Sequence, residues 1–238
     1  MHESHIGIQG CLRRARETVY WPNMNTDIEN YIQRCEICSA CQPDQPKEPM
    51  ISHDIPKRPW ERVGCDLFEF DGNDYLICAD YFSDFFEVDG LHGKTGKEVI
   101  GKMKAQIAHH GIPDVIIIDN GPPFNSREFK DFAEKFEFEH VTSSPRYPQS
   151  NGKAENAVKI VKTLMRKCVL DKKDPFLALL DWRNTANETI GLSAAERLFG
   201  RKTRTRLTLS TRNLRTNDSG EVTSKLYTRK RKQTNYHK

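Results

Sequence analysis

The chain has 238 residues, 37% of them hydrophobic, which is enough to build a folded core and argues against wholesale disorder. No run of 18 apolar residues occurs, so no membrane-spanning helix is expected, and the first residues lack a signal-peptide pattern. Charge is unevenly placed: residues 197–238 hold 13 Lys or Arg and two acidic residues, a balance of +11, so residues 1–196 carry −7. This asymmetry indicates a polyanionic partner held partly by the basic end, or a solvated, flexible tail.

The chain begins with a short helical module. Residues 1–41 show helical spacing of apolar residues over 10–20 and 24–35, interrupted at Trp21-Pro22-Asn23. Residues 42–59 contain five prolines and predict an extended linker. The seven cysteines are an odd number spread over a long chain, which favours a reducing compartment over a disulfide framework.

Strands and helices then alternate over residues 60–200, which we expect to form one α/β domain. Strands are predicted over 63–70, 74–81, 85–91, 115–118 and 139–142, and helices over 95–110, 126–136, 153–171 and 175–189. Asp71-Gly72-Asn73 has the composition of a hairpin turn. This order predicts a mixed sheet with helices on its faces, followed by a basic tail over 201–238.

Three carboxylates occupy chemically suggestive positions. Asp66 lies among apolar residues of the first strand, Asp119 follows the strand at 115–118, and Glu155 lies in the first turn of a long helix, with 35 residues between it and Asp119. Carboxylates are the ligands that Mg²⁺ and Mn²⁺ prefer, and two such ions stabilise the charge that develops when phosphodiesters are cut or joined. Taken singly, each acid also fits a turn residue or a response to the helix dipole.

The sequence around these acids resembles the catalytic blocks of integrases, most closely those of gypsy-class long-terminal-repeat retrotransposons. The matching segments are Gly64-Cys65-Asp66-Leu67-Phe68, residues 119–124 and residues 147–155, and the resemblance covers about residues 2–200. It implies a ribonuclease H-like fold and catalytic Asp66, Asp119 and Glu155 that hold Mg²⁺ or Mn²⁺. The implied reaction trims the 3′ ends of element DNA and joins them to target DNA. Pro123 stands where the family usually has Gln, a departure that predicts reduced activity.

A second metal site is predicted in the helical module. His2, His5, Cys35 and Cys38 form the pattern H-x2-H, 29 residues, C-x2-C, which suits a tetrahedral structural Zn²⁺ site. A 40-residue helical piece has too little core to fold alone, and a bound metal would supply stability. The pattern resembles the His-His-Cys-Cys module that precedes integrase cores. Surface histidines with ordinary cysteines are the alternative, and Cys41 is a possible substitute ligand.

Basic and polar residues near Glu155 are candidates for DNA contact. Lys159 and Lys162 share its helix face, and matching lysines contact element DNA in integrases. Salt-bridged surface lysines are the alternative. The loop before the helix adds Arg146, Tyr147, Gln149 and Asn151, and the tail adds Arg229-Lys230-Arg231-Lys232 as a nuclear import signal or a nonspecific DNA contact.

The sequence predicts an integrase that works in the nucleus as a homo-oligomer on double-stranded DNA, with no membrane and no small-molecule substrate. A domesticated or decayed remnant that binds DNA as a non-catalytic scaffold is the alternative, favoured by Pro123 and the short tail. A plain ribonuclease H-like nuclease is disfavoured by the zinc module and by the lysines beside Glu155.

Overall fold

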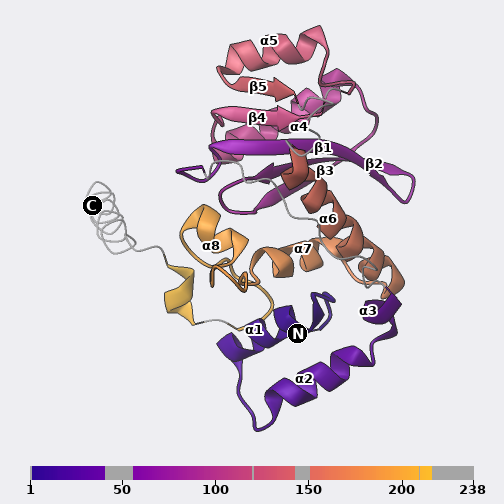
Figure 1. Ribbon diagram of the computed structural model, residues 1–238, viewed down its shortest axis with the longest axis vertical. Coiled ribbons are helices and arrows are strands. Elements are labelled where there is room, and N and C mark those ends of the chain that lie inside the picture. Colours follow the sequence, from indigo (N-terminus) through magenta and orange to yellow (C-terminus); the bar gives the residue numbers. More distant parts are fainter. Residues whose placement is uncertain (1, 41–55, 120, 143–150, 209, 216–238) are drawn as a thin grey trace, which may run out of the picture.

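The computed structural model describes residues 2–40, 56–119, 121–142, 151–208 and 210–215 (Figure 1). Three helices come first: α1 (Gly7–Thr18), α2 (Met24–Gln33) and α3 (Glu36–Ala40). The elements that follow are β1 (Arg62–Phe70), β2 (Asn73–Asp80), β3 (Phe86–Leu91), α4 (Gly96–His110), β4 (Val115–Ile118), α5 (Arg127–Phe136), β5 (Glu139–Thr142), α6 (Gly152–Leu170), α7 (Pro175–Arg183), α8 (Ala194–Phe199) and η2 (Thr211–Leu214). Within these described stretches, no helix combines the length and the apolar character needed to cross a bilayer.

The strands form one mixed sheet in the order β3-β2-β1-β4-β5, which confirms the predicted fold class. β1, β2 and β3 pair antiparallel, whereas β1 with β4 and β4 with β5 pair parallel. The β1–β2 hairpin turns at Asp71 and Gly72, which both have positive φ, 51° and 71°. A two-residue turn of this hand requires positive φ at both central positions, so the Asp-Gly pair suits it.

Helices cover both faces of the sheet and give the molecule two core layers (Figure 1). On one face, β1, β2 and β4 pack against α4 and α5 through side chains that include Val99, Met103 and Phe129. On the other face, β1, β2 and β3 pack against α6 and α7 through Ala157, Val161 and Leu179. Cys11, Cys65, Cys78 and Cys168 are all buried and pack as small apolar side chains.

Several helix starts follow from local capping chemistry. The Ser126 hydroxyl accepts a hydrogen bond from the backbone N–H of Phe129 and so caps α5, and Thr95 caps α4 in the same way. Asp174 caps α7, and Pro175 at its first position needs no backbone N–H. These caps explain why the predicted and observed starts of these helices agree within a residue.

The prediction of one helix over 175–189 is wrong. Helix α7 ends at Arg183, and the Asn187 side chain then accepts from the N–H groups of Thr189 and Ile190 in a turn. The chain reverses and starts α8, which the sequence analysis did not predict. Ser193 and Glu196 form a full capping box at its first turn, a signal that the sequence did contain.

Polar contacts join the N-terminal segment to the rest of the chain. Arg14 of α1 is buried; it forms a 2.8 Å ion pair with Asp181 of α7 and donates to the Asp181 backbone carbonyl. The Ser4 hydroxyl also bonds to the Asp181 carboxylate, and Lys202 pairs with Glu17 of α1 at 2.6 Å. Helix α1 therefore lies beside α7 and α3 contacts α6, whereas α2 packs on α1 and α3, far from the edge strand β5 (Figure 1).

Candidate active site and metal centre

The sheet register places Asp66 and Asp119 side by side at the edge where the parallel pairing of β1 with β4 ends. Gly64 of β1 pairs with Ile117 of β4 in parallel, and each aspartate stands two residues further along its own chain. Because side chains alternate along strands, Asp66 lies on the Gly64 face of the sheet and Asp119 on the Ile117 face, which is the same face. Two acids 53 residues apart in the sequence thus become neighbours through strand pairing.

Glu155 comes to this edge on the first turn of α6. An added Cβ on Gly64 would stand 3.5 Å from the Ala154 Cβ and 3.1 Å from Asn151 Oδ1, so the helix start rests directly on β1. Ala154 is fully buried there, whereas its neighbour Glu155 is exposed. The absence of a side chain at Gly64 is what allows this close approach.

The carboxylates interact electrostatically. The pKa of Asp66 is raised to about 6, mainly by burial and also by the negative charges of Asp119 and Glu155, while the hydrogen bond from Leu67 N–H and the charge of Lys162 lower it. A carboxyl group with this pKa is partly protonated near neutral pH, which is typical of an acid placed in a functional cleft. Backbone N–H groups also contact the two aspartates: Leu67 N–H donates to Asp66 at 2.8 Å, and Gly121 N–H approaches Asp119 at 3.4 Å.

Asn151, expected to contact DNA, is instead buried at 3% exposure. Its side-chain amide donates a 3.1 Å hydrogen bond to the Cys65 carbonyl, on the residue before Asp66. The side chain therefore positions the start of α6 on β1 and does not offer a surface contact. Arg146, Tyr147, Gln149 and the tail basic cluster lie outside the described residues.

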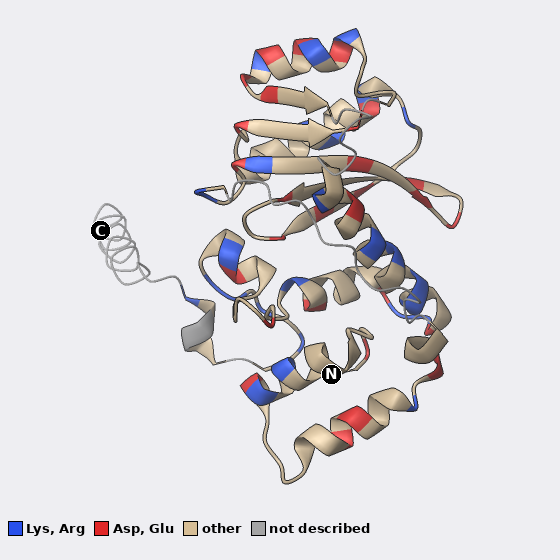
Figure 2. Cartoon of the chain, in the orientation of Figure 1, with Lys and Arg blue, Asp and Glu red and all other residues tan. Residues whose placement is uncertain are grey.

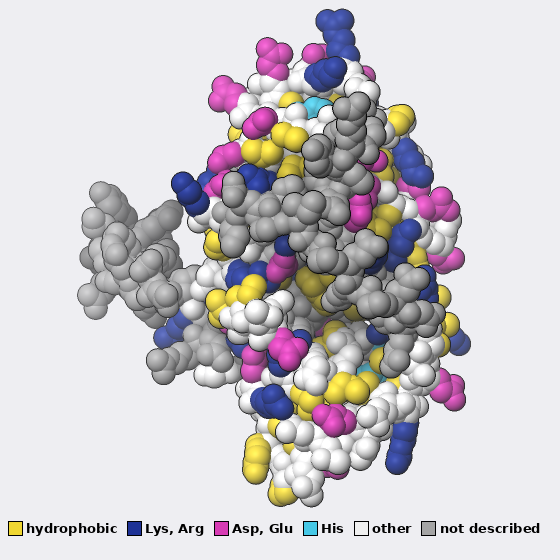
Figure 3. Space-filling model, viewed as in Figure 1, with side chains coloured by type: hydrophobic (Ala, Val, Ile, Leu, Met, Phe, Trp, Pro, Cys, Tyr) yellow, Lys and Arg dark blue, Asp and Glu magenta, His cyan; other side chains and the backbone are white. Residues whose placement is uncertain are grey.

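The two lysines differ in their surroundings, although basic residues recur along the whole of α6 (Figure 2). Lys162 is half-buried, and its Nζ lies 5.7 Å from the centre of the Phe68 ring, close enough to Asp66 to lower that pKa. Lys159 is exposed. In the described part of the face seen in Figure 3, basic and acidic side chains are interspersed. Of these two lysines, Lys162 is therefore the one whose charge acts on Asp66.

Pro123, the departure from the integrase motif, is buried in the turn between Asp119 and α5. Its carbonyl accepts a hydrogen bond from the N–H of Ser126, the residue that caps α5. The proline is therefore part of the packing under this edge of the sheet and fits there without an unpaired donor.

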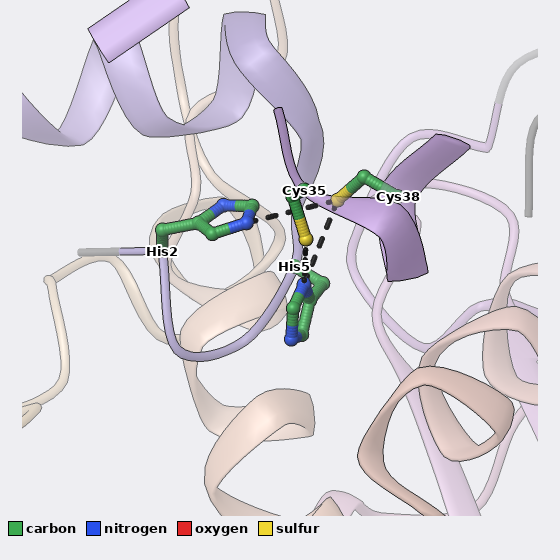
Figure 4. A group of neighbouring side chains, drawn as sticks. All are labelled: His2, His5, Cys35 and Cys38. Atoms are coloured by element: carbon green, nitrogen blue, oxygen red, sulfur yellow. Dashed lines mark hydrogen bonds between the residues drawn. The ribbon is translucent and has the colours of Figure 1, made fainter. Parts of the chain in front are cut away.

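His2, His5, Cys35 and Cys38 come together before α1 and around the start of α3 (Figure 4). One ligand atom from each lies within 4.8 Å of all the others. His5 Nδ1 is 3.5 Å from both sulfur atoms, and His2 Nε2 is 3.8 Å from Cys38 Sγ. In the described stretches, these four form the one group of potential metal ligands gathered this closely; Asp66, Asp119 and Glu155 are not drawn together to the same degree.

The ionisation of this cluster suits a metal. Burial, with a further contribution from His5, lowers the pKa of His2 to about 4, so its ring is neutral at pH 7 and keeps a lone pair. Burial raises the pKa of the Cys38 thiol to about 11, so ion binding would have to displace its proton. Two imidazole nitrogens and two sulfurs at these separations fit tetrahedral Zn²⁺, with bonds of about 2.0–2.3 Å.

Two residues of these sites were missed by the sequence analysis. Asp171, at the end of α6, accepts a 2.9 Å hydrogen bond from His5, which lowers the pKa of Asp171. Tyr81 packs beside Gly64, and burial raises its pKa to about 12, with Glu155 among the contributing charges. No local motif marks either residue, since both reach their sites through tertiary contacts.

Comparisons with known proteins agree with this arrangement. Residues 1–44 match the integrase zinc binding domain family. The chain is 30% identical over 220 residues to uncharacterized protein K02A2.6 of Caenorhabditis elegans, covering 88% of this chain and 17% of that protein. It is 30% identical over 174 residues to the Transposon Tf2-3 polyprotein of Schizosaccharomyces pombe, covering 69% of this chain and 13% of the polyprotein. The chain thus spans less than a fifth of the length of these relatives.

The fold has a counterpart among solved structures. A chain in the cryoEM structure of a simian T-cell lymphotropic virus intasome with PP2A regulatory subunit B56 gamma superposes with a TM-score of 0.57 at 23% identity. The match covers 88% of this chain and 76% of that chain. These findings confirm the resemblance deduced from the motifs: the chain is an integrase-like retroelement protein, with an integrase zinc binding domain at its start and a fold shared with an intasome protein.

Proposed function

We propose that this chain is an integrase that trims the 3′ ends of element DNA and joins them to target DNA, with Asp66, Asp119 and Glu155 as its catalytic carboxylates. The observation that carries the proposal is the β1–β4 register, which sets Asp66, within β1, beside Asp119, just past the end of β4. The start of α6, held on β1 by Asn151, brings Glu155 to the same edge. The raised pKa of Asp66 supports their mutual proximity.

Oxygen donors of this kind fit Mg²⁺ or Mn²⁺, which would supply positive charge to the attacking and leaving oxygens of the phosphodiester. Asp66, whose pKa is raised to about 6, would lose any proton it carries when an ion is held. Lys162 stands next to this edge and is placed to hold a phosphate of the DNA end. Lys159, one helix turn from Glu155 and exposed, extends the same basic face.

The proposed integrase also needs a structural metal, DNA, a second copy of the chain and access to the nucleus. Zn²⁺ held by His2, His5, Cys35 and Cys38 would stabilise the N-terminal helices, because a module of about 40 residues has too small a core to fold alone. Double-stranded DNA is the proposed substrate, and a second copy of the chain the proposed partner, since two DNA ends must be joined. The nucleus is the compartment in which target DNA is met.

A non-catalytic, DNA-binding remnant is the second candidate. Two observations favour it: the described carboxylates are less tightly gathered than the zinc ligands, and the Asp119 side chain lies within 3.4 Å of the Gly121 amide, as in an ordinary turn. Both candidates predict DNA binding, and only one predicts chemistry.

A strand-joining assay separates them. Purified zinc-loaded protein is mixed with Mn²⁺, a labelled duplex that carries a terminal-repeat end and an unlabelled target, beside Asp66→Asn and the exposed Asp131→Asn of α5. Joined products from the wild type and from Asp131→Asn, lost in Asp66→Asn, support the integrase. DNA binding by all three proteins without any joined product would support the remnant and sink the catalytic proposal.

A further inference from the structure

The zinc ligand His5 is held from the core as well as from its own module. Its Nδ1 faces the two cysteines, while its other ring nitrogen points away from them (Figure 4). That nitrogen, Nε2, lies 2.9 Å from the Asp171 carboxylate at the end of α6. His5 is 4% exposed, so its ring has little access to water.

This arrangement defines the tautomer of His5. An imidazole that gives Nδ1 to a metal must carry its proton on Nε2, and Asp171 accepts that proton in a hydrogen bond. Carboxylates in this position orient a metal-bound histidine and make it a stronger ligand. A second contact fixes the backbone of the same residue, because Lys167 Nζ donates to the His5 carbonyl at 2.8 Å.

The position of Asp171 is otherwise unfavourable. It is the C-cap of α6, where unpaired carbonyl groups carry partial negative charge and acidic side chains are disfavoured. A histidine that shares the charge of a bound Zn²⁺ is a favourable partner for such a carboxylate. The presence of Asp171 at this helix end is therefore explained by its bond to the zinc ligand His5 and not by any contact that stabilises α6.

We propose that Asp171 is an outer-sphere positioning residue of the zinc site, so that zinc binding and the docking of residues 2–40 onto α6 are linked. The linkage is reciprocal: the factor by which docking strengthens zinc binding is the factor by which zinc strengthens docking. Glu155 lies on the first turn of the same helix, so zinc restrains the far end of the element that carries it. The inference depends on zinc binding by the module and not on DNA joining.

Zinc affinity of the full chain is the direct test, measured under reducing conditions by competition with a chromophoric chelator. Asp171→Ala should weaken zinc binding about 10–100-fold, the range for outer-shell partners of metal-bound histidines. Asp171→Asn keeps an oxygen acceptor without the charge and should lose less. Asp131→Ala, which removes an exposed acid on α5, should bind zinc like the wild type. Equal affinity in Asp171→Ala and Asp131→Ala would overturn the inference.

Hydrogen exchange of the wild type provides a readout that does not depend on a variant folding. Zinc should slow exchange in residues 165–171 of α6 as well as in α1, α2 and α3. Protection confined to the N-terminal helices would contradict the linkage, even if Asp171→Ala failed to fold. A protein that shows the linkage but joins no DNA leaves this inference standing and counts only against the proposed catalytic activity.

Discussion

The side-chain amide of Asn151 donates to the carbonyl of Cys65, one residue beyond the point where the pairing of β1 with β4 ends at Gly64. This bond anchors the start of α6 beside Asp66. Asn151→Ala should destabilise the protein by about 1–3 kcal/mol, because it leaves a carbonyl in a buried site without this donor. Urea unfolding measures the change.

The matched control is Asn156→Ala, at an exposed position one turn further along α6. Removing that side chain should leave the free energy of unfolding nearly unchanged, since alanine suits a helix better than asparagine. If both variants lose the same stability, the Asn151 bond does not hold the helix as inferred.

The raised pKa of Asp66 predicts a pH effect with a definite sign. Between the unfolded pKa, 3.8, and the folded value of about 6, the folded protein retains a proton that the unfolded chain has lost. The contribution of Asp66 to stability therefore falls as pH rises through this window. Without added Mg²⁺ or Mn²⁺ and with zinc retained, Asp66→Asn should melt a few degrees higher than the wild type at pH 7.

That difference should shrink as the pH approaches 4, where both Asp66 and its amide replacement are neutral. Added Mn²⁺ should raise the melting temperature of the wild type and leave that of Asp66→Asn unchanged, because only the carboxylate loses its repulsion to a cation. A pH-independent difference between the two proteins would show that Asp66 has an ordinary pKa.

Removal of zinc should unfold the N-terminal helices while the sheet persists. The helices α1, α2 and α3 have a small core, and the four metal ligands join segments about 30 residues apart. Chelation should make Cys35 and Cys38 react rapidly with a thiol reagent, followed by mass spectrometry. Cys65 and Cys78 are buried in the sheet and provide an internal control that should stay slow. Equal labelling of Cys35 with and without chelator would argue against a structural ion.

The lysines of α6 predict a salt effect on DNA binding. Lys159→Gln and Lys162→Gln should each weaken binding to any duplex sequence and reduce the slope of log affinity against log salt by about 1. Lys104→Gln, on α4 where Nζ lies 5.6 Å from the Phe132 ring centre, removes the same charge on the opposite face. An equal change in all three variants would mean that net charge, and not this helix face, determines affinity.

Much of the sheet could be predicted because its signals are local. The Asp-Gly turn, the apolar strand at Val115–Ile118 and the cap at Ser126 each express a preference of a few adjacent residues. The end of α7 could not be predicted in this way, because Asn184 bonds back to Leu180 and to Thr203, far along the chain. Tertiary contacts of this kind override the helical pattern that continues to 189.

The site residues likewise fall into those that a sequence pattern identifies and those that only tertiary contacts place. The spacing of histidines and cysteines identified four side chains that the fold brings together, since ligand type and spacing are written in the sequence itself. Asn151 was expected to contact DNA because it lies in the polar loop before the Glu155 helix, and only the approach of α6 to Gly64 buries it. No sequence pattern marked Asp171 as part of the zinc site, because its partner, His5, is 166 residues away in the sequence.

Arg14 has a further consequence for how the two halves of the chain behave together. Arg14 is buried where α1 meets α7, so its ion pair with Asp181 forms at the cost of hydration of both charges and adds little net stability. The pair therefore fixes the position of α1 on α7 more than it holds the two helices together.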